Sequence, residues 1–203
     1  MNKGIGFSAF GALLLATSAF ADGPRTDQVV DRDVNQQERV EQGLQQGQLT
    51  TREAGQIERQ ESRIDQTEAR DLKDGKLSPT EQAHINQMQN QASRDIYRDR
   101  HNAVDGNPDS KSSERLQSDV QRNVNQQQRI NQGVRSGELT NKEAGSLERG
   151  QAHVDRAEAR AGANGHVNAA EQARIQGKEN HQSKRIYNKK HNETVRPAAA
   201  TSR

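Results

Sequence analysis

The feature that most constrains the fold of this chain is an internal duplication. When the 203-residue sequence is shifted by 90 positions, residues 34–102 align with residues 124–192 without a gap, and 30 of the 69 aligned positions are identical. Two unconstrained segments would not keep such an alignment, so the duplication favours two folded copies of one unit over disorder. We expect these copies at residues 22–102 and 115–192, with a linker at 103–114 and a disordered tail at 193–203.

The first 21 residues differ in composition from the rest of the chain. Lys3 precedes an apolar run at residues 5–16, and Ala19-Phe20-Ala21 has the small-x-small form of a signal-peptidase site. The run is too short to cross about 30 Å of hydrocarbon comfortably. We therefore expect a cleaved signal peptide at residues 1–21, a bacterial periplasmic or extracellular protein, and no membrane-spanning segment after cleavage.

Apolar residues within each copy recur at the three- and four-residue spacing of helices. They predict three helices in the first copy, the second beginning after Thr50 and the third after Ser78. Glu53 and Glu81 stand three residues beyond these caps, as in a capping box, and Pro79 suits a first helical position. The second copy repeats both boxes, at Thr140 with Glu143 and at Asn168 with Glu171. The predicted fold class is all-α, with two tandem three-helix units.

The composition permits only thin hydrophobic cores. Hydrophobic residues make up 29% of the chain and aromatic residues 2%, and Cys and Trp are absent. The apolar stripes are narrow enough for either a small three-helix packing or a coiled-coil seam. We therefore expect a protein partner or self-association, and a non-enzymatic interaction or scaffolding role at the cell envelope.

The segments that join the helices carry the most specific local motif. Gly47-x-Leu49-Thr50-x-x-Glu53 is followed by Asp74-Gly75-x-Leu77-Ser78-x-x-Glu81, and residues 137–143 and 164–171 repeat the two patterns. Each segment resembles the second half of an EF-hand calcium loop, with its Gly turn, hydrophobic residue and final Glu. The resemblance implies EF-hand-like junctions in which Leu49 meets Leu77, and Leu139 meets Val167, in a two-stranded bridge.

The first halves of these loops depart from the EF-hand pattern. Arg70 and Leu72 stand where the loop ending at Glu81 needs its first and third oxygen ligands, so tight calcium binding in that mode is not expected. A Gly turn followed by a helix cap explains the same residues without an ion. The junction residues that remain candidate metal ligands are Asp74, Ser78, Glu81, Asn164, Asn168 and Glu171.

Histidine offers a second route to a metal. His84 and Met88 lie four residues apart on one helix face, a spacing that could hold copper. His101 and His191 recur at the ends of the third helices, where the alternative is that they complement the helix dipole while Ile and Tyr pack inward. A further site would arise if His153, His166, His181 and His191 converged. Binding of a divalent cation with modest affinity is therefore an alternative function, and no other cofactor is expected.

Catalytic motifs are missing from the sequence. There is no Cys, G-x-S-x-G, H-E-x-x-H or P-loop. The abundant carboxylates alternate with Lys and Arg at helical spacing, which predicts solvated ion pairs rather than a paired-acid active site. We therefore expect no enzyme.

Charge is unevenly divided between the copies. The first copy carries roughly −4 and the second roughly +6. Lys184, Arg185, Lys189 and Lys190 are candidate anion-binding residues, which makes an anionic polymer or envelope surface a further possible partner. Nucleic acid is not expected, because stacking aromatic residues are nearly absent and the protein is predicted to be exported.

Overall fold

The computed structural model describes residues 26–192, all of whose regular elements are helices, which confirms the all-α prediction. The first copy forms α1 (Thr26–Gln45), α2 (Thr51–Asp71), the short 3-10 helix η1 (Leu72–Asp74) and α3 (Pro79–Arg100). The second forms α4 (Lys111–Ser136), α5 (Asn141–Gly162) and α6 (Ala169–Lys190). This order is compatible with two tandem three-helix units. The expected signal peptide and C-terminal tail lie outside the described residues, and within 26–192 no helix is long and apolar enough to cross a membrane.

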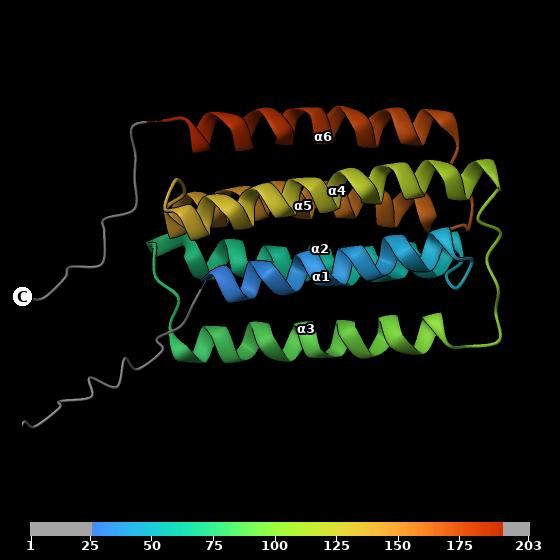
Figure 1. Cartoon of the computed structure of the whole chain (residues 1–203), viewed down its shortest axis with the longest axis horizontal. Helices are drawn as coiled ribbons and strands as arrows, with labels where there is room; N and C mark the ends of the chain where they lie inside the picture. The colour runs from blue at the N-terminus through green and yellow to red at the C-terminus, as the bar shows by residue number, and fades with distance from the viewer. Residues whose placement is uncertain (1–25, 193–203) are drawn as a thin grey trace, which may run out of the picture.

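The six helices lie side by side, and the two copies meet along their long axes. In Figure 1, α1, α2, α4 and α5 form the middle of the bundle, while α3 and α6 flank it on opposite sides. The most extensive contacts between the copies are α2 against α5 and α1 against α4, and η1 against α5 and α2 against α4 add smaller ones. The interface between the two copies therefore forms the interior of the six-helix bundle.

The helix starts agree with the predicted caps. Glu53 donates its backbone N–H to Thr50 Oγ1 at 3.2 Å, and Thr50 returns its own N–H to Glu53 Oε2 at 2.9 Å. The predicted boxes at Ser78, Thr140 and Asn168 form as well. One boundary differs, because Ser110 caps α4 through the N–H of Ser113. The last four residues of the predicted linker therefore belong to a helix.

The bridge implied by the EF-hand resemblance is not formed. Leu49 packs in a cluster with Leu44 and Ile96, whereas Leu77 packs with Leu72 and Ile85 in another. Leu139 and Val167 are likewise in separate clusters, and no strand occurs within residues 26–192. The reason is length: α2 has 21 residues, so the two junctions at its ends stand about 31 Å apart.

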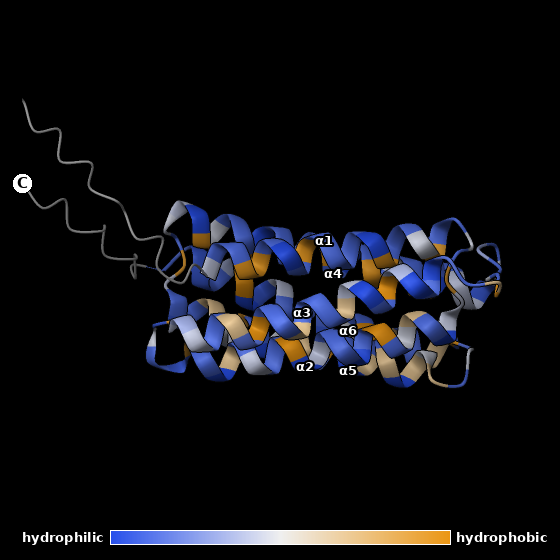
Figure 2. Cartoon of the chain, turned by 90° about the horizontal axis from the view of Figure 1, so that it is seen from below, coloured by the Kyte–Doolittle hydropathy of each residue, from blue (hydrophilic) through white to orange (hydrophobic). Residues whose placement is uncertain are grey.

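The apolar stripes are buried in contacts between helices of this chain. Leu44, Ile57 and Ile96 of the first copy share one buried cluster with Leu116 and Ile175 of the second. Figure 2 shows that hydrophobic residues are sparse along every helix. Among the described residues the exposed large hydrophobic side chains are Tyr97, Val104 and Tyr187. The narrow stripes thus join the copies to each other.

Glycines allow α2 and α5 to approach closely, which gives a first prediction. A Cβ atom on Gly162 would stand 2.7 Å from the carbonyl oxygen of Thr51 and 3.0 Å from Cα of Gly55. Backbone atoms cannot move aside cheaply, so Gly162→Ala should lower the free energy of unfolding by about 1–3 kcal/mol. Urea denaturation followed by circular dichroism would measure this change.

Gly177 provides the matched control. A Cβ there has no neighbour within 4 Å, and the residue lies inside α6. Gly177→Ala should therefore stabilise the protein by up to about 1 kcal/mol through helix propensity. Similar effects from the two substitutions would show that α2 and α5 are not in close backbone contact.

Candidate metal centre

Carboxyl groups line the interface between the two copies. Glu58, Glu61, Asp65 and Glu68 follow one another along α2 at spacings of three, four and three residues, which places them on one helix face. None is more than 1% exposed. Because α2 packs against α5, acidic side chains occupy a position that globular proteins normally fill with apolar ones.

Helix α5 presents the equivalent face. Glu148, Gln151, Asp155 and Glu158 stand 90 positions further on and are at most 2% exposed. Three of the four positions carry the same acid in both copies. Asp65 and Asp155, which are equivalent in the duplication, approach within hydrogen-bonding distance, so this pair lies where the two copies meet.

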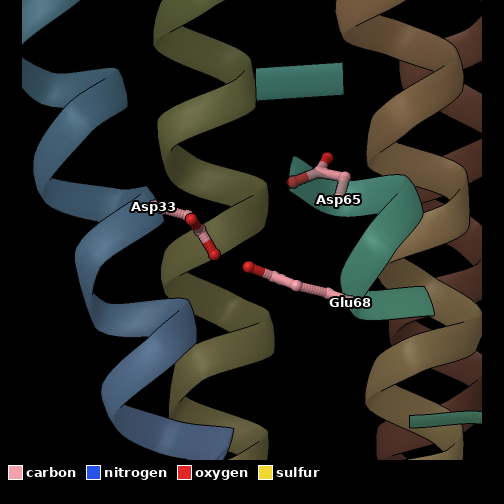
Figure 3. A group of neighbouring side chains, drawn as sticks. All are labelled: Asp33, Asp65 and Glu68. Carbon is pink, nitrogen blue, oxygen red and sulfur yellow. The ribbon is translucent and has the colours of Figure 1, made fainter. Parts of the chain in front are cut away.

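Helix α1 adds Asp33 to this interior. Figure 3 shows the carboxyl groups of Asp33 and Glu68 extending toward each other from α1 and α2, with Asp65 about one turn away from Glu68. One oxygen of each of these three side chains lies within 4.8 Å of the others. We refer to Asp33, Asp65 and Glu68 as the first triad.

A second triad satisfies the same distance criterion. It consists of Glu58 from the first copy with Asp155 and Glu158 from the second, so it exists only because the copies pack together. With Glu61 and Glu148, the two triads form one group of eight buried acids, called the carboxyl cluster below. Its members are Asp33, Glu58, Glu61, Asp65, Glu68, Glu148, Asp155 and Glu158.

Side-chain amides donate hydrogen bonds to the cluster, in addition to the contacts between its own carboxyl groups: Asp33 with Glu68, Glu58 with Glu158, and Asp65 with Asp155. Gln37 and Gln127 are equivalent residues, and their Nε2 atoms donate to Glu58 Oε2 at 3.0 Å and to Glu148 Oε2 at 3.1 Å. The other amide donors are Asn123, to Asp155 at 2.7 Å and Glu158 at 3.2 Å, and Gln89, to Asp33 at 2.7 Å. Within residues 26–192 no Lys, Arg or His is buried, and no ion pair reaches the cluster.

Many of the buried oxygens receive no donor. Both carboxylate oxygens of Glu61 lack a hydrogen-bond partner in the described part of the chain. So does one oxygen of each of the following: Asp33, Glu58, Asp65, Glu68, Glu148 and Glu158. The amide oxygens of Gln37, Gln127 and Gln151 are also without donors. An oxygen lone pair buried without a donor is costly, and a bound cation would satisfy several of them at once.

Burial shifts the titration of the cluster. It raises the pKa of Asp33 to about 7, of Glu58 to about 8 and of Asp155 to about 6. Burial, with the charge of neighbouring acids, also raises the pKa of the remaining members well above the usual range. Near neutral pH the cluster must therefore hold protons, unless a cation supplies the missing positive charge.

The ligand atoms in the cluster are all oxygens. Carboxylate and carboxamide oxygens are the ligands of hard cations such as Ca²⁺, Mg²⁺ and Mn²⁺, whereas copper and zinc favour imidazole or sulfur. Acidic side chains that project inward from facing helices are also the way in which helical bundles build metal sites. The residues present therefore fit a hard divalent cation in each triad.

The junction residues predicted as metal ligands take part in turns and caps. Asp74 Oδ1 accepts the backbone N–H of Lys76 at 2.9 Å, and Asn164 Oδ1 accepts that of His166 at 2.8 Å. The other four form the two capping boxes: Ser78 with Glu81 and Asn168 with Glu171. The four junctions lie at the ends of the bundle, away from the carboxyl cluster.

The predicted His residues and Lys184 are exposed, whereas the side chain of Lys190 is largely covered and pairs with Glu138. His84 is exposed and Met88 is partly buried against the cluster of Ile64 and Ile85. His101 and His191 end α3 and α6, where each ring stacks on a Tyr ring with centroids 4.1 Å apart.

The inward packing expected of the tyrosines is wrong. Ile96 and Ile186 are fully buried, but Tyr97 and Tyr187 are 62% and 57% exposed. The reason is that α3 and α6 flank the bundle and bury only a narrow stripe, so the turn of about 100° from each Ile to the following Tyr carries the Tyr ring out of that stripe.

The carboxyl cluster itself was not predicted, because its acids were interpreted as solvated. A signal was present: Glu61 and Glu68 alternate with Ile57 and Ile64 along one face of α2, so acids continue an apolar stripe. The identical acids in both copies were a second signal. No protein-family model, curated protein or solved structure matches this chain.

Proposed function

We propose that this protein binds hard divalent cations, such as Ca²⁺, Mg²⁺ or Mn²⁺, in the carboxyl cluster between its two copies. The observation that carries the proposal is the set of eight fully buried acids, seven of which have at least one oxygen without a donor, with no cationic side chain among them. Export to the periplasm or beyond, which the first 21 residues favour, would place the protein where such cations are plentiful.

Electrostatic repulsion supports this function over a purely structural role for the acids. Two unit charges 4 Å apart repel by about 4 kcal/mol at the effective dielectric constant of a protein. The ligand oxygens of each triad stand within 4.8 Å of one another, so three ionised groups there would strongly oppose folding. A divalent cation would convert this repulsion into attraction.

A scaffolding role receives less support from the structure. That expectation rested on apolar stripes available for partners, and the stripes are buried between the helices of this chain. Metal binding, by contrast, accounts for the feature that both copies keep in common at their contact.

Cation binding can be tested by calorimetric titration of chelator-treated full chain with CaCl₂, MgCl₂ and MnCl₂. We expect two ions per chain for at least one of these cations, one for each triad. The double variant Asp65→Asn/Asp155→Asn removes one charge from each triad while keeping the size of the side chains. It should weaken binding at each triad by about tenfold to a hundredfold, taking the loss of one charged ligand as at least that of a charge-assisted contact, about 1.5–3 kcal/mol.

The matched control is Asp74→Asn, which neutralises the best-placed carboxylate of the EF-hand-like junctions. This substitution should leave the affinity unchanged. Binding that is lost in Asp74→Asn but kept in the double variant would assign the metal to the junctions. The absence of binding in the unsubstituted chain would reject the proposed function.

A further inference from the structure

The outer grooves of the two copies differ sharply in charge. In the second copy a groove of about 630 Å³ runs between α5 and α6. It is lined by Gly150, His153, Arg174, Gly177, Lys178, His181, Gln182 and Arg185. Three permanent cations and two imidazoles therefore line one hollow, and no acidic residue does.

The equivalent groove of the first copy shows what has changed. Between α2 and α3 a smaller groove is lined by Gln60, Arg63, Met88, Gln91 and Asp95, together with Ile64. This groove contains a carboxylate of the protein itself, that of Asp95. Its Oδ2 atom accepts hydrogen bonds from Gln60 and Gln91, both at 3.0 Å.

The second copy replaces each member of that network. Asp95 becomes Arg185, Gln60 becomes Gly150, and Gln91 becomes His181. The built-in carboxylate and its amide donors have thus given way to a guanidinium, an open position and an imidazole. The duplication supplies the same groove in two forms, and only the first carries its own anion.

The guanidinium of Arg185 is held in place by the protein. It donates to Ser146 O at 2.6 Å and to Gln182 Oε1 at 3.0 Å, while Gln182 Nε2 donates to Leu147 O at 2.8 Å. A Cβ at Gly150 would collide with both Gln182 and Arg185. Glycine at this position therefore leaves open the space that the ends of the Gln182 and Arg185 side chains occupy.

The positive charge of this groove is not neutralised by neighbouring side chains. Arg174, Lys178 and Arg185 make no ion pair within the described residues. Burial, and then the charges of Arg156, Lys178, Arg185 and Arg149, lower the pKa of His153. Glu171 lines the adjoining hollow with Arg174 and Lys178, but it is engaged in the cap of α6.

We propose that the groove between α5 and α6 is a binding site for an oligophosphate anion, of the size of pyrophosphate or tripolyphosphate. Its volume exceeds that of a single phosphate, and a fixed guanidinium flanked by lysine and arginine matches a chain of phosphate oxygens. The lining holds no Trp, Tyr or Phe on which a nucleotide base would stack. The site would contact only the phosphates of a ligand, and its lining residues are not members of the carboxyl cluster.

The test is calorimetric titration of the full chain with tripolyphosphate and, separately, with ATP, in buffer free of divalent cations at about pH 5.5, where the buried acids that have raised pKa values keep their protons and the metal-free chain stays folded. Both ligands should bind with affinities within about threefold of each other, since they share three phosphates. The variant Arg174→Gln/Lys178→Gln changes two exposed side chains and should weaken both by about tenfold or more. Circular dichroism would show that its fold is intact.

The control variant Lys184→Gln/Lys189→Gln removes the same charge from α6 outside the lining of the groove. It should change the affinity by less than about twofold to threefold, as expected for a screened surface charge. Equal losses in both variants would reduce the effect to general surface charge and overturn the site. Binding of ATP without binding of tripolyphosphate, or binding of neither, would overturn it as well.

The outcome is separable from that of the proposed function. The titration contains no divalent cation, and none of the substituted residues belongs to the carboxyl cluster. A failure of oligophosphate binding therefore leaves the metal proposal standing, and a failure of metal binding leaves the groove untouched.

Discussion

The chelator-treated protein should be most stable near pH 5, and its free energy of unfolding should fall steeply as the pH rises to 8. Burial raises the pKa of Glu58 from about 4.5 to about 8 and that of Asp33 from about 3.8 to about 7. Between those limits the folded protein holds more protons than the unfolded chain. Stability therefore decreases with rising pH throughout this window.

The expected effect is large. The shift of Glu58 alone corresponds to a loss on the order of 5 kcal/mol between pH 4.5 and pH 8. Glu179, at about 8, and Asp119, at about 7, act in the same direction on the α4–α6 side. A loss of this size approaches the whole stability of an ordinary domain, so the metal-free protein should be largely unfolded at alkaline pH.

Acids whose pKa is lowered in the folded protein set the lower pH limit of high stability. Hydrogen bonds and nearby cations lower the pKa of Glu81, Glu138, Glu143 and Asp95. Their contribution is present above the unfolded pKa and disappears as the pH falls through the folded value. The two groups of acids together place the maximum of stability near pH 5.

Urea denaturation at pH 5, 6.5 and 8, with chelator and with an excess of the tightest-binding cation, would measure this dependence. The cation should remove most of the loss at pH 8, because it replaces the protons that the cluster gives up. A metal-free protein whose stability is constant or rises from pH 5 to 8 would contradict the assigned burial of the cluster.

Local features of the sequence were sufficient to predict the helices. A capping box lies within four residues, so Thr50 and Ser78 marked the starts of α2 and α3 without knowledge of the tertiary structure. The duplication extended the same prediction to Thr140 and Asn168. Ser110 was missed because it begins a helix inside a segment whose Gly, Asn and Pro residues indicated a linker.

The buried acids of the interior could not be predicted from the spacing of apolar residues along the sequence. Glu58 and Glu148 are each followed directly by an arginine, Arg59 and Arg149, a pairing of opposite charges that is typical of a solvated face. Whether that face meets water or another helix is decided by the docking of α2 on α5. That docking joins residues about 90 positions apart and needs Gly55 and Gly162 at the contact, and neither glycine marks the partner helix by itself.

The grooves illustrate the same limit from the outside. Lys184 and Arg185, and Lys189 and Lys190, stood out in the sequence because each pair is adjacent. Arg174 and Lys178 lie four positions apart and did not. Only the packing of α6 on α5 brings the latter pair together with His153. Of the predicted anion-binding residues, Arg185 alone lines that groove.

Replacement of Glu61 by Met should stabilise the metal-free protein by about 2–4 kcal/mol at pH 8. Glu61 is 1% exposed, neither of its carboxylate oxygens receives a hydrogen bond, and Asp33, Glu58 and Asp155 all act to raise its pKa. The positive charge of Arg39 acts in the opposite direction and lowers that pKa. Replacing a buried, poorly compensated charge with an apolar side chain of similar volume is commonly stabilising by such an amount.

The pH dependence of this gain distinguishes charge from packing. Because burial raises the pKa of Glu61, keeping its proton in the folded protein costs least at low pH, so at pH 5 Met should add little beyond the burial of its own side chain. The gain should grow as the pH rises. At higher pH Glu61 must either keep its proton at increasing cost or ionise in the protein interior, whereas Met does neither. Urea denaturation of both proteins at pH 5 and pH 8 gives the two differences directly.

Two further variants make the comparison specific. Glu61→Gln copies the residue that stands at the equivalent position of the second copy, Gln151, and removes the charge without adding apolar surface. It should show the same growth with pH from a lower starting value. Glu38→Met changes a partly exposed acid and should stay within about 0.5 kcal/mol of the unsubstituted protein at both pH values. A loss of stability in Glu61→Met at pH 8 would mean that Glu61 is ionised and compensated in the folded chain. The cluster would then carry a counter-charge of its own, and the main physical reason for a cation between the copies would be removed.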